Sequence, residues 1–292
     1  MHQKLYDAQI AHTRDHAALL PAVIAAPDTI DAWRHERMYR VLAPLVAGAP
    51  EWSWLTLGDS GGDAFWLRKN GAQDVTASSI SLDQLATIRD AGRLEGVAVR
   101  ALNAEALDLP DASVDFVCCK EMYHHLPRPP VGFYEMLRIS RIGVALVAEP
   151  NGEAQSRPLD RVRRGIKRVL RRNTFMRDPD FEESGNFIFG PTVNEIRKML
   201  TGVQFDCFYY RHLSDFYHPK LAVRRLSDLP PSTLVRSAVL FQDMLSAVGL
   251  TSWAKLSVVI FKRPPAEEVH RGLLKQGMKR IAIRRNPYLR PE

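Results

Sequence analysis

The chain has 292 residues, of which 46% are hydrophobic and 25% are charged, and its formal net charge is +7. This is the composition of an ordinary soluble protein, long enough for one large domain with additions or for one domain and a small second one. Three cysteines, two of them adjacent in an apolar run, favour buried free thiols in a reducing compartment over a disulfide framework or a metal site.

The first 27 residues contain no basic stretch that leads into an apolar core. Their one apolar run, residues 17–26, is about half as long as a membrane span and contains Pro21. We therefore expect a cytoplasmic protein.

Residues 1–48 form an expected N-terminal helical segment, in which Ile30, Trp33, Met38, Val41 and Leu42 recur at near-helical spacing. Strands and helices then alternate to residue 150 at a spacing that predicts crossover units and a parallel sheet. The expected strands are 52–58, 74–79, 97–102, 114–119 and 143–149, and the expected helices are 62–70, 82–92 and 129–139. A helix beginning near residue 192 comes later, followed by a strand at 204–210, a helix at 231–248 and a strand at 254–262.

The basic residues are concentrated in one segment. Residues 157–177 hold nine Lys or Arg against the single Asp160, and the rest of the chain is almost neutral, with 31 basic and 32 acidic residues. The segment predicts a helix with one apolar stripe, formed by Leu159, Val162, Ile166, Val169 and Leu170.

Three roles remain open for this basic helix. It is a solvated helix neutralised by the acidic residues of 178–184, a lid that attracts a phosphorylated or acidic substrate, or a peripheral contact with an anionic membrane or nucleic acid. Because no aromatic residue interleaves the arginines of 157–172, we expect no nucleic-acid partner.

A glycine turn follows the first strand, in the sequence "LTLGDSGGDA" at residues 55–64. Between a strand and a helix, Gly58, Gly61 and Gly62 let the backbone approach a ligand at the helix N-terminus. Alone this pattern is weak, because a tight turn without a ligand has the same sequence.

Further motifs follow in order: "NAE" at 103–105, "SVDFVCCKEMYHHL" at 113–126, "YEMLR" at 134–138 and "GVALVAEP" at 143–150. Together with the glycine turn they resemble the class I S-adenosylmethionine-dependent methyltransferases. The resemblance implies an α/β fold, a Rossmann-like mostly parallel seven-stranded sheet with helices on both faces. The expected organisation is an N-terminal helical segment at 1–48, the α/β domain at 49–263 with a basic insertion at 151–190, and a basic, helical tail at 264–292.

The resemblance also implies S-adenosylmethionine as cofactor and a set of residues that bind it. These are Gly58, Asp59, Ser60, Gly61, Ser79, Asn103, Ala104, Glu105 and Lys120. Thr56, Ser60 and Ser79 depart from the family pattern. Ser79 matters most, because it stands where the family places the acid that holds the ribose. A neutral hydroxyl in place of a carboxylate weakens binding by about 1–3 kcal/mol.

His124, His125 and Glu121 are the expected catalytic residues, because they follow the fourth strand at the ligand-binding edge of the sheet. A neutral imidazole suits removal of the acceptor's proton during methyl transfer. Alternatively, one histidine caps the following helix and the other packs beside prolines. Glu149 ends the next strand, where an ion pair with an arginine such as Arg128 is expected. Two adjacent histidines point in different directions, so we expect no metal.

These patterns predict an enzyme that methylates an oxygen or nitrogen of a small molecule, such as a sugar or a glycosylated or phosphorylated metabolite. Two rivals remain. One is a methyltransferase fold repurposed for a non-methylating role, which Ser79 and Thr56 favour. The other is a protein that uses the basic helix to bind an anionic partner.

Overall fold

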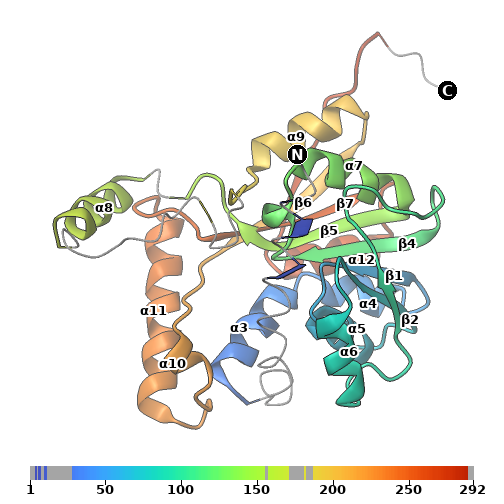
Figure 1. Ribbon diagram of the computed structural model, residues 1–292. Coiled ribbons are helices and arrows are strands. Elements are labelled where there is room, and N and C mark those ends of the chain that lie inside the picture. Colours follow the sequence, from blue (N-terminus) through green and yellow to red (C-terminus); the bar gives the residue numbers. More distant parts are fainter. Residues whose placement is uncertain are drawn as a thin grey trace.

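The computed structural model describes residues 4, 6–7, 10–11, 28–154, 157–170, 181 and 187–288. Its centre is an eight-stranded sheet with the strand order β3-β2-β1-β4-β5-β7-β6-β8 (Figure 1). Strands β1 to β5 pair in parallel, and β7 runs antiparallel to both of its neighbours, β5 and β6. The expected α/β fold with a mostly parallel sheet is confirmed.

The seven strands expected from the sequence are all present. They are β1 (Ser53–Leu57), β2 (Asp74–Ser79), β3 (Ala98–Ala101), β4 (Val114–Lys120), β5 (Ser140–Pro150), β6 (Cys207–Leu213) and β7 (Lys255–Phe261). An eighth strand, β8 (Lys279–Ala282), pairs antiparallel with β6 and extends the sheet by one edge strand.

Helices cover both faces of the sheet (Figure 1). One face packs against α3 (Ile30–Tyr39), α4 (Ala43–Gly48), α5 (Gly62–Lys69), α6 (Asp83–Asp90) and α12 (Glu267–Lys275). The other face packs against α7 (Pro129–Ile139) and α9 (Val193–Gly202).

The central strands are apolar because both of their faces are buried. In β4, Cys118 belongs to the core under one face and Cys119 to the core under the other. Both cysteines and Cys207 are free and buried, as expected from the sequence. Burial raises the pKa of the Cys118 and Cys119 thiols well above its usual value, which keeps them protonated and unreactive.

The basic helix is present as α8 (Pro158–Leu170), which lies at the far left of Figure 1, near the C-terminal end of α11 (Leu229–Ala247). The short helix α10 (Pro219–Ala222) lies near the other end of α11. Asp160 ties the first turn of α8 to the chain after α11, because its Oδ2 accepts from the Ser252 amide at 2.9 Å. Val162 and Ile166 of the predicted stripe are 55% and 54% exposed. The basic residues of 171–177 and the acidic residues of 178–184 lie outside the described residues.

The tail was expected to be helical, and α12 confirms this only for its first part. Residues 279–282 form β8 instead, with Met278 and Ile283 buried at either end of the strand. In "MKRIAIRR" an apolar run of three residues, 281–283, stands between two pairs of basic residues, and a pattern this short does not indicate a strand.

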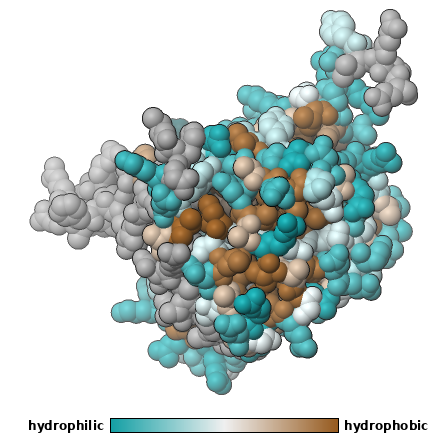
Figure 2. Space-filling view, turned by 45° about the vertical axis from the view of Figure 1, so that its right-hand side comes forward, coloured by the Kyte–Doolittle hydropathy of each residue, from teal (hydrophilic) through white to brown (hydrophobic). Residues whose placement is uncertain are grey.

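Across the described ranges, no helix is both long and apolar enough to cross a membrane. Figure 2 shows hydrophilic residues over most of the visible face, with groups of hydrophobic residues near its middle. Apolar atoms normally contribute much of a folded surface.

Candidate active site

The glycine turn between β1 and α5 has the geometry that the sequence predicts. Gly58 has a φ of +66° and Gly61 a φ of +99°, values that side chains disfavour and glycine adopts freely. The turn stands at the carboxyl end of β1, between the parallel strands β2 and β4. Open parallel sheets bind their ligands at this edge.

Asp59 shapes this turn from within. It is 1% exposed, and its Oδ1 accepts from the amides of Gly61 at 2.6 Å and Asp63 at 3.1 Å. Its Oδ2 accepts from the Ala64 amide at 2.9 Å and from the Thr56 hydroxyl at 2.7 Å. The carboxylate therefore caps the first turn of α5. The Thr56 hydroxyl supports that cap, and a direct contact between Asp59 and a cofactor stays a prediction.

The two serines at the end of β2 differ in their side-chain hydrogen bonds. The Ser78 hydroxyl donates to the backbone oxygen of Thr56 at 2.7 Å, which ties β2 to β1. Ser79 is 5% exposed, and its backbone oxygen accepts from the Leu102 amide at 3.0 Å. Within the described part of the chain, the Ser79 side chain forms no hydrogen bond. The Ser79 hydroxyl is therefore available to bind a ribose at the predicted position. The Ser78 hydroxyl is not available, because it already donates to Thr56.

Asn103 and Glu105 lie at the end of β3 and act mainly on the backbone around them. Asn103 Oδ1 accepts from the Glu105 amide at 3.0 Å, which closes a tight turn. Glu105 is 4% exposed and accepts from the Tyr6 hydroxyl at 2.6 Å and from Arg128 Nε at 2.8 Å. Glu105 therefore joins the N-terminal segment to the loop before α7, whereas its binding to a cofactor stays a prediction, as does that of Ala104.

His124 and Glu149 form a buried pair. Glu149 is 0% exposed, and its carboxylate accepts from the amides of Met122, Tyr123 and His124 at 3.0–3.2 Å. Its Oε2 lies 2.6 Å from His124 Nδ1. Because the carboxylate only accepts, Nδ1 carries the proton, and in the neutral imidazole Nε2 then has the lone pair. The expected pairing of Glu149 with Arg128 is wrong, because Arg128 pairs with Glu105 and His124 takes its place.

His124 and His125 belong to a single turn of 3-10 helix, η2 (Tyr123–His125), that follows β4. Their ring centroids lie 4.0 Å apart. His124 is 8% exposed, and His125 is partly exposed. The carboxylate of Glu149 thus fixes the position of His124, and His125 lies against it. The alternative that one histidine caps α7 is not seen, since Arg128 occupies the N-cap position.

Lys120 and Glu121 at the end of β4 form an ion-pair chain with Lys255 at the start of β7. Glu121 Oε2 lies 3.2 Å from Lys120 Nζ, and its Oε1 lies 2.6 Å from Lys255 Nζ. Burial alone raises the pKa of Glu121, but the two lysines more than offset this and hold it well below its usual value. Glu121 therefore stays ionised, with a φ of +49° that aims it between the lysines.

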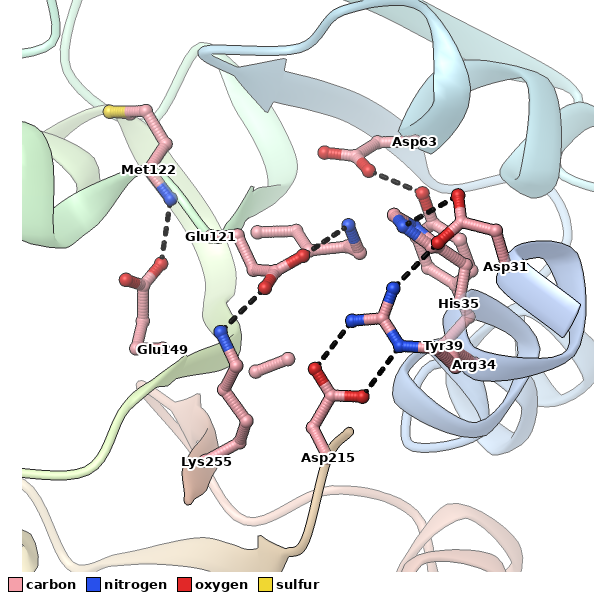
Figure 3. Close-up of polar contacts among 12 residues, drawn as sticks. Asp31, Arg34, His35, Tyr39, Asp63, Glu121, Met122, Glu149, Asp215 and Lys255 are labelled. Carbon is pink, nitrogen blue, oxygen red and sulfur yellow. Dashed lines mark hydrogen bonds and ion pairs between the residues drawn. The ribbon is translucent and has the colours of Figure 1, made fainter. Parts of the chain in front are cut away.

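Helix α3 forms a wall of this site that the sequence did not reveal (Figure 3). The Tyr39 hydroxyl donates to Asp63 Oδ1 at 2.6 Å, and Lys120 Nζ lies 5.2 Å from the centre of the Tyr39 ring. Burial, with the nearby Asp59 charge, raises the pKa of Asp63 to about 7. The charge of Lys120, together with burial, lowers the pKa of His35 to about 3.

Arg34 anchors α3 to the chain after β6. Its guanidinium donates to both carboxylate oxygens of Asp215, from Nε at 2.8 Å and from Nη2 at 2.5 Å, and to Asp31 at 2.6 Å (Figure 3). A bidentate ion pair of this kind is rigid as well as strong. The N-terminal helix is therefore an integral part of the site.

The side chain of Met122 covers the glycine turn. A Cβ built on Gly58 would lie 2.1 Å from Met122 Cγ. A ligand that approaches Gly58 from this side displaces the methionine, whose side chain has three rotatable bonds and a low cost of rearrangement. No group of three or more metal-binding side chains is found among the residues with described positions.

Sequence reasoning missed His35, Tyr39, Asp63 and Lys255. A signal existed for the first two, which stand four residues apart on one face of a predicted helix. Asp63 directly follows the glycine turn in "GGDA". Lys255 is the second residue of the predicted strand 254–262, and nothing near it in the sequence connects it with Glu121.

Comparison with known proteins gives one match by sequence family. Residues 56–148 match the family described as "Methyltransferase domain". No curated protein matches the chain.

Several solved structures are similar in shape at low sequence identity. A S-adenosylmethionine-dependent methyltransferase from Methanosarcina mazei is 17% identical, with 75% of this chain and 96% of that chain covered and a TM-score of 0.46. One from Mesorhizobium loti is 16% identical, with 76% and 97% covered and a TM-score of 0.47. Magnesium protoporphyrin IX methyltransferase from Synechocystis, solved with bound S-adenosylhomocysteine, is 12% identical, with 80% and 84% covered and a TM-score of 0.48.

Proposed function

Because residues 56–148 match the family described as "Methyltransferase domain", we propose that this chain transfers a methyl group from S-adenosylmethionine to an oxygen or nitrogen of a small molecule. A sugar or a glycosylated or phosphorylated metabolite is the proposed class of acceptor. One observation carries the proposal: the carboxyl ends of β1, β2 and β4 bring the glycine turn and Ser79 to the same edge as the His124–Glu149 pair.

The residues at this edge suit the proposed cofactor. Gly58 is exposed and has no side chain, so a ligand can reach the backbone once Met122 turns aside. The Ser79 hydroxyl, which is free of side-chain hydrogen bonds within the described residues, would hold the ribose, and Asn103 would meet the adenine ring. The cofactor supplies the activated methyl group when it is bound.

His124 is the proposed general base. Its Nδ1 proton is held by Glu149, so Nε2 has the lone pair that takes the acceptor's proton as the new bond to carbon forms. Glu149 is a positioning residue, because it fixes the tautomer and the orientation of the ring. His125, whose ring lies tilted against that of His124, remains a second candidate for contact with the acceptor.

Glu121 has a different proposed role. A base must be able to hold a proton near neutral pH, and two lysines keep the pKa of Glu121 well below its usual value. We therefore assign Glu121 to holding the acceptor or the cofactor's amino group by charge, not to removing a proton.

The proposed role of the basic helix is contact with an anionic acceptor or an anionic surface. A helix that is only solvated would turn its apolar stripe toward the protein, but Val162 and Ile166 are more than half exposed. These exposed residues support contact with a partner.

Substitution of Ser79 by aspartate tests the cofactor site. Ser79→Asp restores a charged acceptor at the ribose position, so it is expected to tighten S-adenosylhomocysteine binding by about 1–2 kcal/mol, or roughly five- to thirtyfold. Isothermal titration calorimetry measures the change. The control, Ser237→Asp, places the same charge on an exposed position of α11 and is expected to leave affinity unchanged.

An unchanged or weaker affinity in Ser79→Asp would contradict the proposed ribose position. That outcome favours the rival function, a methyltransferase fold repurposed for a non-methylating role. The same rival draws support from the coverage of Gly58 by Met122.

A further inference from the structure

A second pocket, of about 440 Å³, lies beside the carboxyl end of β6. Strand β6 pairs with β7 as far as Leu213, but its pairing with β8 begins only at Tyr210, opposite Lys279. Within the described residues, no strand therefore lies beside the edge of its last three residues. Helix α11 and the turn before β8 enclose the space there.

The pocket has more positive than negative charge. Arg37, Arg211 and Lys279 line it, and the single carboxylate among its lining residues is Asp243. Asp243 is already engaged, because it accepts from Arg37 Nη2 and from the Ser214 amide, both at 3.1 Å. Arg211 and Lys279 form no ion pair or hydrogen bond with any described residue. The lining residues therefore have a net positive charge, although Asp243 also acts on Arg211 at longer range.

Arg211 is held in a partly dehydrated position. Burial, with the charge of Arg37, lowers its pKa from the usual value, yet a guanidinium remains charged near neutral pH. Its Nε lies 3.9 Å from the position that a Cβ on Gly277 would take. Gly277 has a φ of +76° and belongs to the turn before β8. A guanidinium partly kept away from water without a direct ion pair is unfavourable, and an anion that enters the pocket relieves this cost.

The pocket also offers a flat apolar surface. The rings of Trp253 and His212 stack with centroids 6.4 Å apart and an angle of 14° between their planes. His212 Nε2 is buried and has no hydrogen-bond partner in the described part of the structure. A ring bound beside these residues stacks against them.

The pocket lies on the same edge of the sheet as the proposed methyl-transfer site but farther along it. Strand β6 stands three strands away from β4 in the sheet. Neighbouring strands are about 4.8 Å apart, so the carboxyl ends of β4 and β6 lie about 14 Å from each other. The pocket borders the candidate active site, because Arg37 belongs to α3 and Leu213 pairs with Lys255.

We propose that this pocket binds a small organic anion, with its phosphate or carboxylate group between Arg211 and Lys279 and its ring against Trp253. A volume of about 440 Å³ is in the range of small-molecule sites. The ligand is separate from the cofactor and binds with it at the same time.

Titration with simple aromatic anions tests this proposal. Phenyl phosphate and benzoate each combine a ring with one of the two anionic groups, and phenol has the ring alone. Ligand-observed NMR measures their dissociation constants with the full-length protein. We expect saturable binding of at least one anion in the low millimolar range or tighter, and much weaker binding of phenol. The tighter of the two anions distinguishes a phosphate site from a carboxylate site.

Variants locate the binding. Arg211→Gln and Lys279→Gln are each expected to weaken the anion about tenfold or more, because each removes a charged hydrogen-bond donor. Lys275→Gln removes an exposed lysine of the same segment outside the pocket and is the control. Arg211→Lys keeps the charge and is expected to bind better than Arg211→Gln, which separates loss of charge from loss of folding.

Three results would overturn the proposal: no saturable anion binding to the wild type, equal affinity for phenol, or equal weakening by Lys275→Gln. Displacement of the anion by S-adenosylhomocysteine would also contradict it, because the two sites would then be one. These outcomes do not depend on whether the chain methylates an acceptor.

Discussion

Asp63 offers a direct test of the electrostatics at the glycine turn. The residue is 5% exposed in the first turn of α5, and its carboxyl group accepts a 2.6 Å hydrogen bond from Tyr39. Burial and the nearby charge of Asp59 raise its pKa to about 7, from a model-peptide value of 3.8. We consider the variant Asp63→Asn, which keeps the shape and removes the titration.

The expected effect has a definite sign. Between pH 4 and 7 the folded protein keeps a proton on Asp63 that the unfolded chain has lost, so the free energy of unfolding falls as pH rises. Each pH unit changes this free energy by at most about 1.4 kcal/mol, and the window is about 3 units wide. The stability of Asp63→Asn relative to the wild type is therefore expected to rise by up to about 4 kcal/mol from pH 4 to pH 7, and to level off above pH 7.

Urea denaturation of both proteins at pH 4.5 to 8 measures this difference. All other titrating groups are shared, so their contributions cancel in the comparison. Asp74→Asn, at an exposed carboxylate at the start of β2, is the control and is expected to show no such trend. Parallel stability curves for Asp63→Asn and wild type, or a difference that falls with pH, would refute the assignment of a raised pKa to Asp63.

Two further substitutions test the framework of the site by the same denaturation assay. Glu149→Gln is expected to lower the free energy of unfolding by about 3 kcal/mol, because it leaves buried amides and His124 without a charged acceptor. A loss under about 1 kcal/mol would show that this carboxylate does not hold the turn at 122–124 in place. Gly58→Ala is expected to cost about 1–2 kcal/mol because φ is +66°, and to shift Met122, whereas unchanged stability would argue against the left-handed turn.

Much of the fold was predictable because its patterns are local. The apolar strands from β1 to β5 have turn signals between them, and the glycine turn has a sequence of its own. Strand β8 was missed because it is a short edge strand in a basic segment, where no alternation of apolar and polar residues marks it. Its partner, β6, lies some 70 residues earlier in the chain, and nothing local indicates such a pairing.

The position of the site residues was predictable from the sequence, but the side chains that pair with them were less so. The histidines, Glu121 and Ser79 were expected at the carboxyl edge because their strands end there. Their partners come from distant segments: His124 pairs with Glu149, and Glu121 with Lys255. A charged residue can satisfy its partner from any element that the fold brings near, so sequence alone gave Glu149 the wrong one.

Binding of the cofactor by the wild-type protein tests the central claim most directly. We predict that calorimetric titration with S-adenosylhomocysteine gives saturable binding with one site per chain and a dissociation constant below about 1 mM, equivalent to at least about 4 kcal/mol of binding free energy. The absence of saturable binding at millimolar concentration would contradict a methyltransferase function for this chain.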